Sequence, residues 1–148
     1  MKTNRFFLDT AYVLALLNPN DIYHKPATVL LPSMQSAQEV WITEAVLIEI
    51  GNALARSNRS AAVAFINSCY VTPNVRVVPV DSPLLKRAVD FYNNREDKEW
   101  GLTDCISFIV SHLRQIKDNI HIGRVPYVKK SVPNYLTPID FKNSFLTI

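Results

Sequence analysis

The stretch Arg5-Phe6-Phe7-Leu8-Asp9-Thr10 decides the fold, because it joins a short apolar run to an acidic residue near the start of the chain. A second apolar run, residues 11–17, follows at once. The first run is short and continuous, which predicts a buried strand, and the second predicts a helix. Asp9 then stands at the carboxyl end of the first strand, where open α/β sheets bind their ligands.

The rest of the chain continues this alternation of strands and helices. Strands are predicted at 40–42 and 75–80, and helices at 24–37, 44–56, 60–70, 82–91 and 103–110. Pro79 indicates an edge strand or a strand end. Beyond Leu113 the pattern weakens, and 120–122 and 126–128 could be short strands. The alternation predicts βαβ units and a mostly parallel sheet covered on both faces.

The bulk properties are those of one ordinary globular domain of 148 residues, with 48% hydrophobic and 20% charged residues. No run of about 18 apolar residues exists, so we expect no membrane association, and no secretion signal is visible. Cys69 and Cys105 lack metal-ligand spacing, which favours two reduced, buried thiols in a cytoplasmic protein.

The net charge of +3 is unevenly distributed. Residues 1–109 carry 10 Lys and Arg against 11 Asp and Glu, a net charge of −1, whereas residues 110–148 carry 6 against 2, a net charge of +4. A basic end favours a polyanionic partner. A solvated basic tail explains the same pattern equally well.

Three acidic residues stand in unusual places. Asp9 directly follows an apolar strand, Glu49 interrupts an almost wholly apolar helical surface, and Asp104 opens an apolar helix after Thr103. Each has an ordinary explanation: an N-cap for Asp9, an exposed position for Glu49 and a favourable first-turn charge for Asp104. A lone carboxylate among apolar neighbours is nevertheless costly to bury.

The three acids gain meaning when they are considered together. In a parallel sheet Asp9, Glu49 and Asp104 can all face the carboxyl edge of the strands. Clustered carboxylates resist joint ionisation unless a cation lies between them, and oxygen ligands without nearby His or Cys suit Mg²⁺ or Mn²⁺. Such a site activates water and stabilises in-line displacement at a phosphodiester.

These segments resemble the motifs of the PIN domain nucleases. The segment 7–17 is similar to the family's first motif, 43–50 to its second, with Glu49 at the acidic position, and 100–108 to its third. The residues from Tyr23 to Ala27 also fit the family's opening of the second helix. The resemblance covers roughly residues 5–112, so we expect a single PIN-like domain over 1–148 that is atypical after about residue 112.

The resemblance implies a three-layer α/β/α fold and metal-dependent cleavage of RNA, typically by a VapC-type toxin that a bacterial antitoxin neutralises. Asp9, Glu49 and Asp104 would be catalytic metal ligands for Mg²⁺ or Mn²⁺. Thr10 and Ser107 could place hydroxyls near the metal or its waters. A cognate antitoxin and a homodimer are the expected protein partners.

The C-terminal part departs from the family pattern. PIN domains usually carry a fourth acid about 20 residues after the third motif, where this chain has residues 121–125 without an acid. Asp97, Asp118 and Asp140 are the alternatives for that position. Several basic residues could steer RNA toward the site, although they could equally serve solubility: Arg114, Lys117, Arg124, Lys129 and Lys130.

Two other functions remain open at the level of the sequence. The missing fourth acid is compatible with a catalytically impaired PIN-like module that binds RNA or a protein. A phosphatase with Asp9 as nucleophile would need a second Asp two residues later, and position 11 is Ala. The main hypothesis is therefore a Mg²⁺- or Mn²⁺-dependent endoribonuclease.

Overall fold

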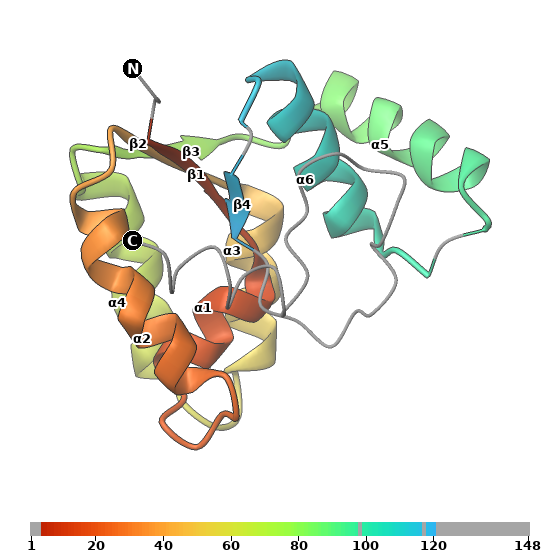
Figure 1. Cartoon of the computed structure of the whole chain (residues 1–148). Coiled ribbons are helices and arrows are strands. Elements are labelled where there is room, and N and C mark those ends of the chain that lie inside the picture. The colour runs from red at the N-terminus through yellow and green to blue at the C-terminus, as the bar shows by residue number, and fades with distance from the viewer. Residues whose placement is uncertain (1–3, 98, 117, 121–148) are drawn as a thin grey trace.

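The computed structural model describes residues 4–97, 99–116 and 118–120, and these residues form a parallel sheet with helices around it (Figure 1). The strands are β1 (Arg5–Leu8), β2 (Glu39–Thr43), β3 (Val75–Val78) and β4 (Asp118–Ile120). Their spatial order is β3-β2-β1-β4, and every neighbouring pair is parallel. Asp9 thus follows a central strand of the sheet.

The helices connect these strands in the alternating order that the sequence predicts. They are α1 (Thr10–Leu17), α2 (His24–Gln35), α3 (Glu44–Ala53), α4 (Arg59–Val71), α5 (Ser82–Asn94) and α6 (Leu102–Leu113). Polar side chains just before four of the helices accept a hydrogen bond from a first-turn backbone N–H, which fixes where each helix begins. These N-caps are Asp9, Thr43, Asn58 and Asp81.

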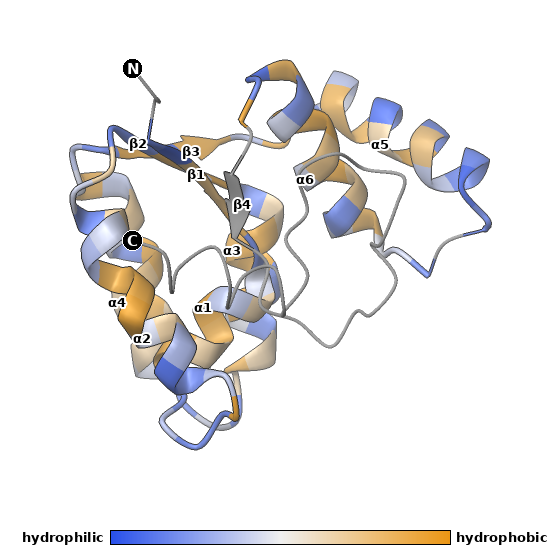
Figure 2. Ribbon diagram, in the orientation of Figure 1, coloured by the Kyte–Doolittle hydropathy of each residue, from blue (hydrophilic) through white to orange (hydrophobic). Residues whose placement is uncertain are grey.

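The two faces of the sheet have different cores because successive strand residues point to opposite sides. Phe6 and Leu8 pack into the larger core, to which α1, α2, α3 and α4 contribute. Phe7 points the other way and packs with Val110 of α6 and with Ile116. Helices thus cover both faces, and the predicted α/β/α fold is confirmed. Figure 2 shows that hydrophobic residues recur along these helices.

Differences from the predicted elements lie mainly at helix ends. α3 stops at Ala53 rather than at residue 56, and α6 begins at Leu102, before the predicted cap Thr103. β3 is an edge strand that ends just before Pro79, as predicted. A strand after the third motif exists at Asp118–Ile120, slightly earlier than expected, whereas the possible strand at 126–128 lies outside the described residues.

The structure also bears on the cysteines and on possible membrane-spanning helices. Cys69 and Cys105 are both free and buried, as predicted. Within residues 4–97, 99–116 and 118–120, no helix has the length and apolar character that a membrane crossing requires.

Candidate metal centre

Asp9 lies at the junction of β1 and α1 and is only 6% exposed. Its Oδ1 accepts a hydrogen bond of 2.9 Å from the backbone N–H of Tyr12, so the carboxylate caps α1. The same side chain lines a pocket at the carboxyl edge of the sheet. Asp9 therefore caps α1 and also lies in the pocket at the carboxyl edge of the sheet.

Glu49 reaches the same pocket from the middle of α3. Its side chain is exposed and accepts a hydrogen bond from the hydroxyl of Thr10, the first residue of α1. α3 begins directly after β2, which is parallel to β1 and hydrogen-bonded to it. The strand pairing therefore brings the start of α1 and the face of α3 together, and with them Thr10 and Glu49.

Asp104 comes from the first turn of α6, on the other side of the pocket. Its Oδ2 accepts a hydrogen bond of 2.9 Å from the backbone N–H of Gly101, the N-cap position. Burial raises the pKa of the Asp104 carboxyl, the hydrogen bond from Gly101 acts in the opposite direction, and the negative charge of Glu49 raises the pKa further. Asp104 and Glu49 are thus close enough to repel each other.

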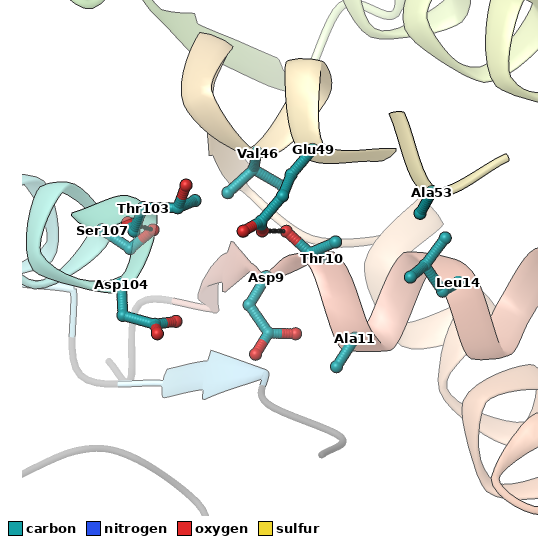
Figure 3. A pocket seen from close by; sticks show the side chains of 10 residues that line it. All are labelled: Asp9, Thr10, Ala11, Leu14, Val46, Glu49, Ala53, Thr103, Asp104 and Ser107. Carbon is teal, nitrogen blue, oxygen red and sulfur yellow. Dashed lines mark hydrogen bonds between the residues drawn. The ribbon is translucent and has the colours of Figure 1, made fainter. Parts of the chain in front are cut away.

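The pocket formed in this way has a volume of about 350 Å³. Asp104 lies toward one end of the pocket with Thr103 and Ser107 of α6, and Asp9 and Glu49 lie nearer its middle (Figure 3). The buried Ser107 hydroxyl donates to the carbonyl oxygen of Thr103 at 3.0 Å. The ten lining residues are Asp9, Thr10, Ala11, Leu14, Val46, Glu49, Ala53, Thr103, Asp104 and Ser107.

The donor set fits a hard divalent cation. The polar side chains that line the pocket offer carboxylates and hydroxyls, and the described lining residues include no Cys, His, Lys or Arg. Oxygen donors of this kind are the ligands of Mg²⁺ and Mn²⁺. Within the described part of the chain, no three His, Cys, Asp or Glu side chains yet surround a common point closely enough to hold an ion. One carboxylate oxygen of Glu49 accepts the hydrogen bond from Thr10.

The structure places the side chain of one candidate for the fourth acid, Asp97, and the backbone of a second, Asp118. Asp97 lies in the α5–α6 connection, where it pairs with Arg95 at 3.1 Å and does not line the pocket. Asp118 is in register with Phe6, near the start of the strands and away from the carboxyl edge. Asp140 lies outside the described residues, as does the segment 121–125.

Of the five basic residues predicted to steer RNA, the structure describes Arg114, which does not line the acidic pocket. Arg114 is the C-cap of α6, at the opposite end of that helix from Asp104. Its guanidinium lies 5.1 Å from the ring centre of Trp41. The other four basic residues, Lys117, Arg124, Lys129 and Lys130, are outside the described residues.

The pocket also has an apolar part, for which the sequence alone indicates no role. Ala11 and Leu14 of α1 and Val46 and Ala53 of α3 form this part. The only sequence signal is their helical spacing from Thr10 and Glu49, because residues three or four apart share a helix face.

Comparisons with known proteins agree with this architecture. The family model of the PIN domain matches residues 6–120, and the chain therefore belongs to the PIN domain family. The match extends past residue 112 and includes β4.

Among solved structures, the chain is similar to VapC20 of Mycobacterium tuberculosis, a toxin that cleaves the sarcin–ricin loop. The TM-score is 0.72 at 27% identity, and the match covers 80% of this chain and 89% of the toxin. No curated protein sequence matches significantly.

Proposed function

We propose that this chain is a Mg²⁺- or Mn²⁺-dependent endoribonuclease and acts as the toxin of a toxin–antitoxin pair. The observation that carries the proposal is the meeting of Asp9, Glu49 and Asp104, from three separate elements, in one pocket of a PIN domain. The similarity to an RNA-cleaving VapC toxin supports RNA as the substrate. All three acids are proposed metal ligands.

The chemistry follows from this set of oxygen donors. When bound, a divalent ion would lower the pKa of a water and offset the charge that develops on the phosphodiester. Asp9 is held by its capping bond to Tyr12, so its carboxylate is presented in a fixed orientation. The Thr10 hydroxyl, which donates to Glu49, is placed to orient that carboxylate or to bond a water in its place.

The burial of Asp104 also supports a bound cation in the pocket. Burial and the charge of Glu49 both disfavour its ionised form, as the raised pKa indicates. A cation in the pocket would reverse that preference, because opposite charge favours the ionised carboxylate. None of the described residues that line this pocket is a Lys or Arg that could do so.

The substitution Asp9→Asn tests the assignment with little disturbance of the fold. Asn caps helices about as well as Asp, so the bond from the N–H of Tyr12 can be kept while the charge is lost. We expect cleavage of a mixed RNA substrate in Mg²⁺ to fall by at least about 100-fold, the scale for loss of a transition-state charge contact. Gel or fluorescence assays with and without EDTA measure this.

Asp90→Asn is the matched control, because Asp90 is exposed on α5 and does not line the pocket. It should cleave RNA at the wild-type rate. Wild-type activity in a folded Asp9→Asn protein, verified by circular dichroism, would refute the role of Asp9. Cleavage that persists in EDTA would refute the dependence on a divalent metal.

The proposed protein partners are an antitoxin and a second copy of the chain, in the cytoplasm where RNA is available. Several helices expose large apolar side chains, as an interaction surface requires. On α5 these are Leu85, Val89 and Tyr92, which follow helical spacing and are 40–51% exposed. Light scattering of the purified chain, alone and co-expressed with a small neighbouring gene product, tests both associations.

A catalytically impaired module that binds RNA or protein is the second candidate. It is favoured by the sequence of residues 121–125, which contains no acid where PIN domains usually carry their fourth. This candidate predicts RNA binding that EDTA does not change and no Mg²⁺-dependent cleavage. The mixed-RNA assay therefore separates the two.

A further inference from the structure

The pocket that contains the acids continues into an apolar groove between two helices. Ala11 and Leu14 are three residues apart and lie on one face of α1. Val46 and Ala53 lie on the face of α3 that also carries Glu49. In Figure 3, Leu14 and Ala53 lie at the end farthest from Asp104, with Asp9 and Glu49 between. The groove thus starts at the carboxylates and leads away from them.

The groove exists because its walls carry small side chains. α1 packs against α3, yet Ala11 and Ala53 leave space between the two helices. Ala53 is exposed and Leu14 is half-buried, so the groove opens to solvent at this end. Val46, which is 1% exposed, forms part of its wall. A larger side chain at position 53 would fill this space without disturbing the core.

The chemistry of the walls restricts what the groove can bind. Among the described residues, its walls are formed by Ala11, Leu14, Val46 and Ala53, whose side chains are aliphatic and offer neither charge nor hydrogen bonds. A phosphate would find no cation among these residues, whereas the apolar face of a nucleobase packs against apolar side chains. The whole pocket, with its acidic part included, has a volume of about 350 Å³, near the lower end of small-molecule sites, roughly 300–1,000 Å³, and thus fits one nucleotide rather than several.

We propose that this groove binds the base of one nucleotide adjacent to the cleaved phosphodiester, with Leu14 and Ala53 as its contacts. The inference rests on the proposed ribonuclease function, because the phosphodiester must lie at Asp9, Glu49 and Asp104. Base and phosphate belong to one covalent unit, so a groove continuous with the carboxylates receives the base when the phosphate is in place. The aliphatic walls distinguish bases by size rather than by hydrogen bonds.

An abasic scan of the substrate tests the proposal without altering the fold. Oligoribonucleotides with one cleavage site would carry an abasic residue on either side of the cleaved bond. In the wild type, the abasic residue at one of these two positions should lower kcat/KM about tenfold, the scale of one stacked base. In Ala53→Leu, where Leu fills the groove, cleavage of the intact oligonucleotide should fall by a similar factor, and the abasic residue should have no further effect.

Two controls keep the test specific. Ala64→Leu makes the same change at an exposed position of α4 that does not line the pocket, and it should retain the wild-type sensitivity to the abasic residue. Fluorescence anisotropy in EDTA reports binding without cleavage. The abasic residue should weaken Kd about tenfold for the wild type and leave Kd unchanged for Ala53→Leu.

The outcomes separate this inference from the proposed function. If the wild type cleaves RNA but tolerates both abasic positions, the base subsite is refuted and the nuclease assignment stands. Equal sensitivity of wild type and Ala53→Leu would also overturn the subsite. If the wild type cleaves no RNA but anisotropy shows base-dependent binding that Ala53→Leu abolishes, the nuclease proposal fails and the base groove is supported.

Discussion

Asp9 combines a structural and a proposed chemical task in one side chain. One carboxylate oxygen accepts the hydrogen bond of Tyr12 N–H that starts α1, and the side chain also lines the acidic pocket. The capping task needs only an oxygen acceptor, whereas the proposed metal site needs negative charge. Asn can perform the first task and not the second, which is why Asp9→Asn separates them.

Tyr12 is the neighbouring residue on which the position of α1 depends. It is 1% exposed, and its hydroxyl donates to the carbonyl oxygen of Ala27 in α2 at 3.1 Å. We predict that Tyr12→Phe lowers the free energy of unfolding by about 1 kcal/mol, the typical net value of such a bond. Urea denaturation measures this. Tyr92→Phe, at an exposed position on α5, should change stability much less, and equal effects would contradict the role of the buried bond.

The two buried thiols give a prediction about pH. Burial is the largest cause that raises the pKa of Cys69 and of Cys105, each to about 11 from a usual value of 9.0. The folded state therefore holds these protons more tightly than the unfolded state, so the contribution of the two thiols to stability should be constant below pH 9 and fall as pH rises from 9 to about 11. Denaturation midpoints across that range measure the slope. Cys69→Ala should make the slope shallower, because Cys105 still contributes, and an unchanged slope would contradict the assignment to Cys69.

At the scale of elements, capping side chains decide where helices begin, and we predict that the Thr43 cap contributes most to stability. Thr43 is fully buried, and its Oγ1 accepts from the N–H of Val46 at 3.3 Å at the start of α3, the helix that carries Glu49. Thr43→Val keeps the shape but removes the acceptor, so we expect a loss of about 1 kcal/mol of unfolding free energy. Thermal or urea denaturation checks this. Thr43→Ser, which retains the hydroxyl, should lose less, and the reverse order would show that the methyl group matters more than the cap.

The element boundaries show how far local sequence signals extend. β1 and α1 were predictable because an apolar strand, a capping acid and an apolar helix follow one another without interruption. The start of α6 was placed too late, since Thr103 is a good cap by type. Asp104 instead reaches back to the N–H of Gly101, and the helix begins at Leu102. Residue type identifies possible N-cap positions, but the hydrogen bonds that form in the fold determine where the helix begins.

At the scale of the whole molecule, the sequence predicts the acids better than it predicts their surroundings. Parallel pairing of β1 with β2 brings Asp9 near Glu49, and this follows from the order of strands and helices. The apolar groove did not follow, because Ala11 and Ala53 matter only through the space between α1 and α3. A small side chain leaves no local pattern, so such a groove becomes visible only in three dimensions.

The charge balance of the pocket leads to a prediction for the whole fold. Asp9, Glu49 and Asp104 line one pocket whose lining, among the described residues, includes no Lys or Arg, and the charge of Glu49 raises the pKa of Asp104. A cation bound between the carboxylates would offset such repulsion. A ligand that binds only the folded state stabilises it by about 2.7 kcal/mol at a concentration 100 times its Kd. We therefore expect Mg²⁺ or Mn²⁺ to raise the Tm of the wild type by several degrees in differential scanning calorimetry.

The variant Asp9→Asn makes this prediction specific to the acidic pocket. In EDTA its Tm should be close to that of the wild type, because Asn retains the cap of α1. In Mg²⁺ it should gain little, since a ligand is lost, whereas Asp90→Asn should gain as much as the wild type. An equal gain in Asp9→Asn would mean that the cation binds elsewhere on the chain. Because Tm is measured without RNA, this result tests the metal centre independently of any cleavage.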